Sequence, residues 1–221
     1  MQMHQDHRLR RVGARLTVVA TLAVGSLLVA LAVPAMASPV PGTATGATTV
    51  TLGGKAYSTL QSNGCGTLVV TAANGVTTSV VPKGLKVIFP VSGIVTQPDN
   101  TDALRLDHSG SVTLQNDCYA ITLANLRVTN FGLPNQGTSF DLSAITRSAD
   151  DTGRQVIGTL DLSGAQMSTV GNKTRISQMN LLTAPEGAEE LNELAVGGDG
   201  STGPFTVGEK VGFARTRVVI G

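Results

Sequence analysis

Short runs of alternating apolar and polar residues, separated by turn residues, fill the chain from Val50 onward. Successive side chains of a β-strand point to opposite faces, so this period of two predicts strands that bury one face. We therefore expect an all-β fold, an antiparallel β-sandwich or a partly open barrel of about nine short strands. The predicted strands are 68–71, 76–81, 85–91, 112–115, 119–129, 139–145, 155–162, 173–182 and 213–220.

Two turn signals predict which neighbouring strands form hairpins. Asn74-Gly75 stands between the first two runs, and this dipeptide supplies the positive φ angles that a two-residue hairpin turn requires. Asn116-Asp117 stands between the run 112–115 and the run that follows it. In this second hairpin, we expect Val112 and Leu114 to lie opposite the apolar residues of the next strand. Those residues are Tyr119, Ile121 and Leu123.

One segment near the C-terminus has the period of a helix rather than that of a strand. Thr183 and Glu186 have the spacing of a capping box, and Pro185 between them suits a first helical turn. Apolar residues then recur on one helical face, and Gly197-Gly198 follows. That face consists of Ala188, Leu191, Leu194 and Ala195. We expect one short C-terminal helix that closes one end of the strand assembly.

The first 37 residues have the organisation of a secretion signal. Arginines within residues 8–15 precede an uncharged apolar run, 16–33, and Ala35-Met36-Ala37 forms an A-x-A cleavage site. The alternative is an uncleaved membrane anchor, because the run is long enough to span a bilayer. We favour a signal peptide, 1–37, since Pro34 ends the apolar run directly before the small residues.

Cleavage at this site would leave one folding unit outside the cytoplasm. Residues 38–49 are Ser, Pro, Val, Gly, Thr and Ala without any charge, a composition that buries too little surface to become ordered. We expect a flexible lead-in there and a single β-sandwich domain over residues 50–221. The signal predicts a secreted protein, either extracellular or associated with the cell wall.

The charge of the mature chain bears on its partners. Loss of the leader removes four of the 16 Lys and Arg residues and one of the 15 Asp and Glu residues, which leaves 12 and 14. Nucleic-acid binding depends on clustered cations that release phosphate counterions, and binding to anionic lipid depends on a polybasic segment. We therefore expect no nucleic-acid partner and, after cleavage, no membrane partner. A small molecule or a component of the cell envelope is the expected kind of partner.

Cys65 and Cys118 are the only cysteines of the chain. A single pair in an exported protein is usually a disulfide, and closing this loop would stabilise the fold by about 4 kcal/mol in the chain-entropy model. The alternatives are two free thiols or half of a metal site. Because His108 is the one histidine after the leader, we expect a disulfide.

The motifs of the common enzyme classes are absent from the sequence. His108 has no accompanying Gly-x-Ser-x-Gly elbow, and the ligand spacing of a zinc site is missing. The glycine-rich stretches 53–55 and 197–200 lack the spacing of a phosphate loop. One sequence leaves open a glycosidase with two carboxylates, although the seven aromatic residues barely supply the stacking that sugar sites use. We expect neither an enzyme nor a metal site.

Several short motifs resemble a known family of exported domains. They are IFPVSG at 88–93, LDHSGSV at 106–112, ITLANLRV at 121–128, GAEELN at 187–192 and GEKVGFA at 208–214. Together they resemble secreted actinobacterial domains related to the HtaA haem-uptake family, over roughly residues 85–220. The resemblance implies an all-β protein that is exported or held at the cell surface.

The resemblance also implies a candidate haem site. Haem-binding members of the family hold ferric haem through a tyrosine oxygen with a histidine in support. In this sequence the histidine motif falls on His108, and the tyrosine corresponds to Tyr57. A phenolate is a hard anionic ligand that suits Fe(III), and a neighbouring donor stabilises its charge. The alternative makes Tyr57 an ordinary strand residue and His108 a turn residue.

The sequence thus leaves two functions open. The first, which we expect, is an exported, non-enzymatic module of the cell envelope or extracellular space, with a structural or interaction role and no cofactor. The second is HtaA-like binding of haem or another porphyrin through Tyr57 and His108.

Overall fold

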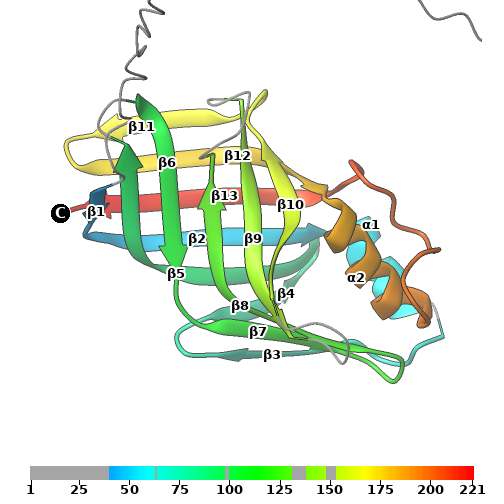
Figure 1. The fold of residues 1–221 in the computed structure, drawn as a ribbon. Helices are drawn as coiled ribbons and strands as arrows, with labels where there is room; N and C mark the ends of the chain where they lie inside the picture. The colour runs from blue at the N-terminus through cyan, green and yellow to red at the C-terminus, as the bar shows by residue number, and fades with distance from the viewer. Residues whose placement is uncertain (1–39, 63, 98–99, 131–137, 148–152) are drawn as a thin grey trace, which may run out of the picture. The chain divides into compact units, whose positions relative to one another are not determined.

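The computed structural model describes residues 40–221 except 63, 98–99, 131–137 and 148–152, so the predicted signal peptide lies outside the described residues. The described part of the chain forms 13 strands and two helices (Figure 1). The strands are β1 (Val40–Gly42), β2 (Ala44–Gly53), β3 (Val69–Ala73), β4 (Thr77–Val81), β5 (Gly84–Gln97), β6 (Asn100–His108), β7 (Ser111–Gln115), β8 (Ala120–Thr129), β9 (Ser139–Arg147), β10 (Arg154–Asp161), β11 (Gln166–Val170), β12 (Lys173–Thr183) and β13 (Lys210–Ile220). The helices are α1 (Gly54–Ser62) and α2 (Pro185–Val196).

Eight of the strands pair in a ring. Antiparallel ladders join β2, β5, β6, β8, β9, β10, β12 and β13 in that order, and β13 pairs back with β2. Closure removes the unpaired edges that an open sheet would expose. In Figure 1, β6, β8 and β9 run across β2, β13 and β12, which lie behind them. The expected all-β antiparallel fold is therefore confirmed.

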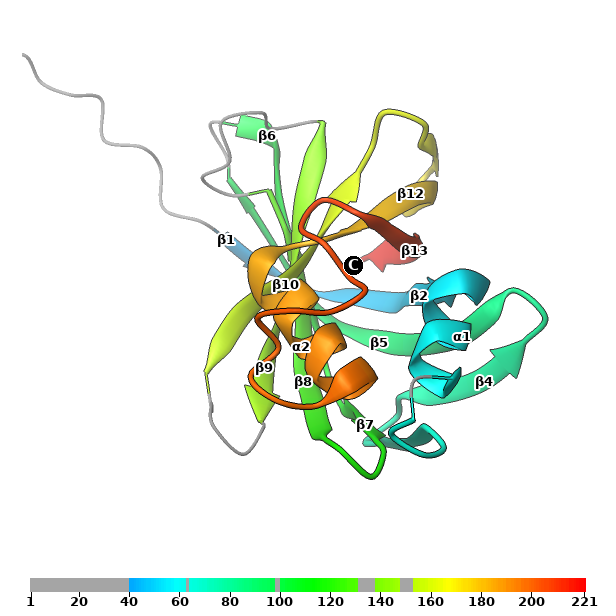
Figure 2. The ribbon, with the colours of Figure 1, turned by 90° about the vertical axis from the view of Figure 1, so that its right-hand side faces the viewer.

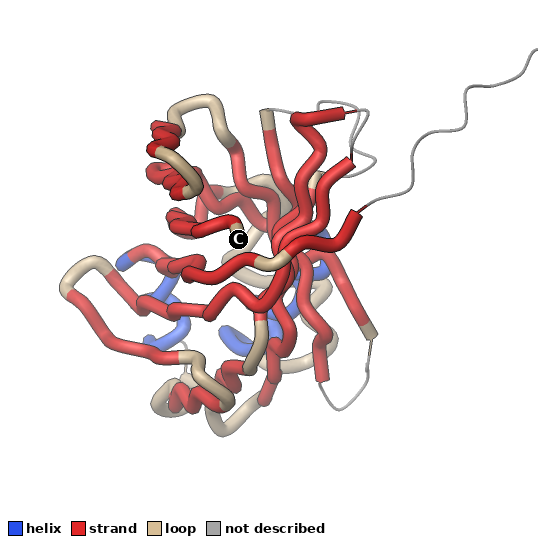
Figure 3. The backbone as a smooth tube through the Cα atoms, turned by 90° about the vertical axis from the view of Figure 1, so that its left-hand side faces the viewer, coloured by secondary structure: helices blue, strands red, loops and turns tan. Residues whose placement is uncertain are grey.

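The remaining strands extend the ring outward. β1 and β4 pair with β5, β7 pairs with β8, β3 pairs with β7, and β11 pairs with β12. Both helices lie at one end of the ring, which Figure 2 views directly, and they lie behind the strands in the opposite view of Figure 3. The expected count of about nine strands was too low, chiefly because β1, β2, β6 and β11 were not predicted.

The buried side chains come from every strand of the ring. Alternation along each strand turns one set of side chains inward, as the sequence pattern predicts. These inward residues, with Leu60 of α1 and Leu194 of α2, form a single apolar core. Its members include Phe89, Leu106, Leu126, Leu142, Leu160, Met179, Ala214 and Val218.

The N-terminal boundary of the ordered chain differs from the predicted one. Residues 38–49 were expected to be a flexible lead-in, but β1 and the first six residues of β2 lie there. β2 pairs with β13 on one side and with β5 on the other, which satisfies its backbone hydrogen bonds. The segment is rich in threonine, a β-branched residue that suits strands, and this property outweighs its low apolar content.

One of the two predicted hairpins is confirmed. β7 pairs with β8, and Val112 and Leu114 lie opposite Leu123 and Ile121. Around the other turn, Asn74 and Gly75 have the expected positive φ angles of 53° and 87°. However, no pairing joins β3 to β4 within the described chain, since β3 pairs with β7 and β4 with β5. The dipeptide reverses the chain, but β3 and β4 each pair with a different strand.

The C-terminal helix is confirmed, but its predicted cap is wrong. α2 begins at Pro185 with Ala184 as N-cap and no side-chain cap. Thr183 is instead the last residue of β12, and its hydroxyl donates a hydrogen bond to the Thr206 carbonyl. Thr183 pairs with Gly158 in the strand ladder, so it does not serve as the helix cap that the sequence predicted.

A second helix, α1, was not predicted. Its buried residues Ala56 and Leu60 are four positions apart, which places them on one helical face against the core. The glycines at 53 and 54 resembled a turn in the sequence, and the nine-residue helix is too short for a clear periodic signal. The expectation of one helix was therefore wrong, and α1 carries one of the predicted site residues.

Candidate functional site

Tyr57 lies on α1, at the end of the ring that carries both helices. Its side chain is half-buried and packs against the apolar core. Its phenol oxygen accepts a hydrogen bond of 3.0 Å from the Gln61 amide, one helical turn further along. Tyr57 is thus a helix residue, not the strand residue of the alternative interpretation.

His108 is the last residue of β6 and is buried, with 2% of its surface exposed. Nδ1 lies 3.0 Å from the Leu126 carbonyl oxygen, and Nε2 lies 2.7 Å from the Thr48 hydroxyl. Because a carbonyl oxygen only accepts, a neutral ring carries its proton on Nδ1 and accepts the Thr48 proton at Nε2. The Thr48 oxygen lies a further 2.9 Å from the Thr216 hydroxyl.

Burial governs the charge of this imidazole. Desolvation lowers the pKa of His108 from 6.5 to about 4, although the Leu126 carbonyl and the Asp107 charge act in the opposite direction. The ring is therefore neutral at pH 7, and both of its nitrogens are already hydrogen-bonded. His108 joins β6, β8, β2 and β13 across the interior.

The structure gives Tyr57 and His108 separate partners. Thr48, which contacts His108, lies five residues before the end of β2, a distance of roughly 16 Å along the strand. α1 begins only beyond that end. The two side chains share no hydrogen bond within the described chain. Their joint action in one haem site stays a prediction.

The predicted disulfide is confirmed. Cys65 and Cys118 are bonded and lie 53 positions apart in the sequence. Cys65 is buried and Cys118, in the turn between β7 and β8, is exposed. The adjacent Asp117 amide donates a 2.9 Å hydrogen bond to the Cys65 carbonyl. The bridge therefore fastens the segment that follows α1 to this turn.

An apolar cavity of about 120 Å³ lies between the inner faces of the ring strands and α2. Nearly all of its lining is aliphatic, and Leu191 and Leu194 of α2 close it. Small-molecule pockets usually measure 300–1,000 Å³, so the cavity is too small to enclose a porphyrin.

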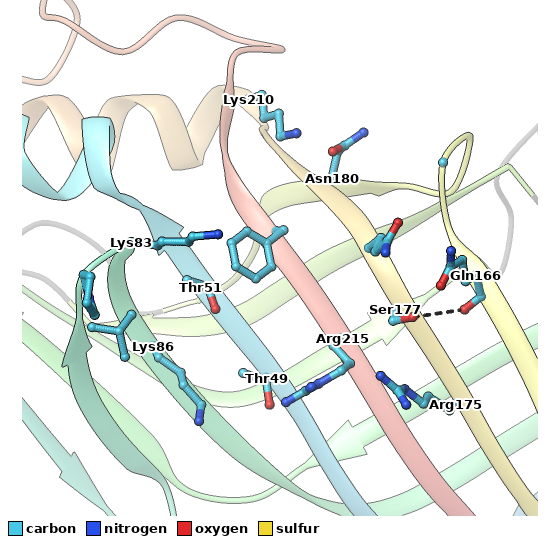
Figure 4. Close-up of a pocket in the computed structure, with 15 residues that line it drawn as sticks. Thr49, Thr51, Lys83, Lys86, Gln166, Arg175, Ser177, Asn180, Lys210 and Arg215 are labelled. Atoms are coloured by element: carbon cyan, nitrogen blue, oxygen red, sulfur yellow. Dashed lines mark hydrogen bonds between the residues drawn. The ribbon is translucent and has the colours of Figure 1, made fainter.

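A larger depression lies on the outer face of β2, β13 and β12, between the β4–β5 turn and β11 (Figure 4). It measures about 900 Å³, and its lining includes Lys83, Lys86, Arg175, Lys210 and Arg215. Hydroxyl and amide groups and the ring of Phe213 lie among these cations, and no acidic residue lines it. We call this depression the cationic groove.

Sequence reasoning missed this groove because its cations are scattered along the chain. One local signal could have indicated it: Lys173 and Arg175, and likewise Arg215 and Arg217, are two positions apart within predicted strands. A period of two places both members of each pair on the same face. That β12 and β13 are neighbours, and that this face points outward, depends on the tertiary structure.

Two further observations concern the described residues alone. No group of three or more His, Cys, Asp or Glu residues is arranged to hold a metal ion in the described ranges. None of the helices in this part of the chain has the length and apolar character needed to span a membrane.

Comparison with solved structures identifies relatives of the fold. The C-terminal domain of HtaA from Corynebacterium glutamicum has a TM-score of 0.59 and 16% identity, over 82% of this chain and all of that one. The N-terminal domain of HtaA from the same organism has a TM-score of 0.55 and 14% identity, over 81% and 99%. No protein-family model and no curated protein matches the chain. The predicted resemblance to HtaA domains is thus confirmed at the level of the fold.

Proposed function

We propose that this chain is a haem- or porphyrin-binding module of the HtaA type. The observation that carries the proposal is the shared fold, which extends over the whole of the HtaA C-terminal domain. The family resemblance implies a tyrosine ligand, and Tyr57 is half-buried beside the core rather than free in a loop. The proposal replaces the purely structural role as our preferred function.

Tyr57 fits ferric haem as a ligand, but His108 does not stand beside it as the resemblance implied. The Tyr57 oxygen is a hard donor that suits Fe(III), and the Gln61 amide already donates to it. In this arrangement Gln61 supplies the stabilising hydrogen bond that the resemblance assigned to His108. His108 is occupied by Leu126 and Thr48. Because the interior cavity is small, the porphyrin would bind outside the ring, beside α1.

Each residue then has a separate task. Tyr57 would bind the iron through its phenol oxygen, and Gln61 would orient that oxygen through its hydrogen bond. Ferric haem would supply the Lewis-acidic iron and a Soret band that reports its ligation. His108 would hold β6 against β2 and β8, so its replacement should alter stability before it alters ligation.

Titration of the purified chain with hemin tests the proposal. We expect a saturable Soret shift that Tyr57→Phe abolishes and Gln61→Leu weakens. Tyr119→Phe is the matched control, because Tyr119 is the other tyrosine and its hydroxyl donates to Glu190 at 3.0 Å. An unchanged Soret shift in Tyr57→Phe, or an equal loss in Tyr119→Phe, contradicts the assignment. A selective loss in a folded His108→Gln would instead support the original Tyr57–His108 pair.

We also propose that the module is exported and has no catalytic activity of its own. The fold relatives are HtaA domains, and the predicted signal peptide places the mature chain outside the cytoplasm. Mass spectrometry of the culture medium and of the cell-wall fraction should detect a chain that begins at Ser38. Turnover of ester, peptide or glycan substrates that one substitution abolishes would contradict the second part of the proposal.

A further inference from the structure

The cations of the chain are distributed unevenly over the molecule. Of the 12 Lys and Arg residues after the predicted leader, five line the cationic groove. A second depression, of about 410 Å³, shares Arg175 with the groove and adds Lys173 and Arg217. Seven of the 12 cations therefore lie along one outer face, on β5, β12 and β13 and in the turn between β4 and β5. After the predicted leader, the chain has more acidic than basic residues and nevertheless has one cationic face.

The described cations outside this face have partners, and three of them, Lys55, Arg105 and Arg127, make ion pairs, while Arg154 donates to the Asn125 carbonyl. Lys55 pairs with Glu209, and Arg105 and Arg127 both pair with Asp107. In the part of the chain that the structure describes, none of the seven makes an ion pair or a side-chain hydrogen bond. The charge of one of the seven, Lys210, acts on Asp161, whose pKa is lowered by hydrogen bonds from Ser163 and Asn180 and further by this charge. The other six cations make no ion pair with a described carboxylate.

Two of these cations oppose one another across neighbouring strands. Arg175 of β12 and Arg217 of β13 are direct partners in the ladder, and Arg215 follows two positions along the same face. Like charges directly opposite each other destabilise a sheet. An anion between the two guanidinium groups would remove this repulsion, since each guanidinium can bind an anionic oxygen pair with two hydrogen bonds.

The remainder of the groove has the chemistry of carbohydrate recognition. The hydroxyl groups of Thr49 and Ser177 and the amide of Gln166 line the groove together with the cations (Figure 4). Phe213, 41% exposed, adds an aromatic side chain to the lining of the groove. The cations of β13 extend from Lys210 to Arg217, roughly 23 Å along the strand. This length matches several linked sugar units rather than one small anion.

We propose that the cationic groove, together with the adjoining depression that contains Lys173 and Arg217, binds an acidic glycan, a linear chain of sugars that carry carboxylate groups. Arg175, Arg215 and Arg217 bind the carboxylates, the hydroxyl and amide side chains bind sugar hydroxyls, and the Phe213 ring packs against a sugar face. The groove contains no Tyr57 or His108, so this site is separate from the proposed haem site. The glycan proposal and the haem proposal can therefore be disproved independently of each other.

Isothermal titration of the full mature chain with tetragalacturonic acid, at low and at moderate salt, tests the site. We expect saturable binding that weakens as salt screens the charges, and no binding of the neutral sugar maltotetraose. Arg215→Gln and Arg175→Gln should each weaken binding by about tenfold or more, because each removes charged hydrogen bonds. Lys55→Gln, which removes a cation outside the groove, is the matched control and should bind as the unaltered chain does.

A second set of measurements separates a glycan from other anions. Phe213→Ala should weaken binding of tetragalacturonic acid but not of inorganic tripolyphosphate. The thermal unfolding midpoint of ligand-free Arg175→Gln should be unchanged or higher, since the repulsion with Arg217 is relieved. Tyr57→Phe should bind the glycan normally, whatever its effect on hemin.

Several results would overturn the proposal. They are absence of binding at low salt, equal binding of maltotetraose, an equal effect of Lys55→Gln, or indifference to Phe213→Ala. Tighter binding of a single-stranded oligonucleotide would assign the groove to nucleic acid, against the expectation from net charge. Displacement of the bound tetrasaccharide by hemin would assign the groove to the porphyrin.

Discussion

His108 shows how a single side chain can set the acid stability of the protein. The folded state holds the imidazole neutral, with a pKa of about 4, whereas the unfolded chain has the ordinary value of 6.5. Between these two values the unfolded state binds a proton that the folded state does not. The free energy of unfolding therefore rises with pH through this window and falls as the pH drops below 6.5.

We predict that His108 makes the free energy of unfolding about 2 to 3 kcal/mol lower at pH 4.5 than at pH 7. His108→Gln retains a hydrogen-bonding side chain but does not titrate, so this part of the pH dependence should disappear. Urea unfolding of both proteins from pH 4.5 to pH 8 measures the difference. The two curves should run parallel above pH 7, and parallel curves below pH 6.5 as well would contradict the prediction.

At the scale of elements, α2 approaches the ring strands more closely than an ordinary side chain would permit. A Cβ atom on Gly187 would collide with the backbone carbonyl of Ile157 on β10. Gly187 is therefore required because it lets α2 approach β10 closely. It does not adopt a positive φ angle. Leu194 and Ala195 of the same helix are fully buried, so a displacement of α2 would also open the apolar core.

We predict that Gly187→Ala destabilises the protein by about 2 kcal/mol or more, although alanine usually stabilises an exposed helix. The matched control is Glu189→Ala, two positions further along α2 at an exposed site, which should change the free energy of unfolding by less than about 0.5 kcal/mol. Thermal and urea unfolding of both variants make the comparison. A neutral or stabilising Gly187→Ala would show that α2 can shift away from β10 without cost.

For the molecule as a whole, closure of the ring depends on β2. This strand joins β13 to β5, and its first six residues lie within the predicted lead-in. Their removal would leave unpaired backbone groups on both neighbouring strands, which would expose two sheet edges. Thr48, which holds His108, would be lost with them.

We predict that a chain beginning at Val50 fails to fold, whereas a chain beginning at Ser38 folds cooperatively. Circular dichroism, gel filtration and urea unfolding of the two chains measure this. A chain beginning at Thr43 is the control, because it lacks β1 but retains all of β2. Cooperative unfolding of the Val50 chain would mean that the ring can close without the first six residues of β2.

The sequence by itself determined the features that depend on near neighbours. Alternation predicted most strands and the β7–β8 hairpin, helical spacing predicted α2, the cysteine pair predicted the disulfide, and short motifs predicted the HtaA-like fold. Alternation also indicates which residues share a face. These signals work because the period of a strand or helix is set by the local backbone.

Only the tertiary structure decided which strands pair, which face is enclosed and which side chains meet. It placed β3 against β7, buried His108 against Thr48, and aligned Arg175 with Arg217. Residues 54–62 form a helix because Ala56 and Leu60 are buried against a core that distant strands assemble. Such choices depend on backbone pairing and apolar burial between residues far apart in the chain, and no local period contains that information.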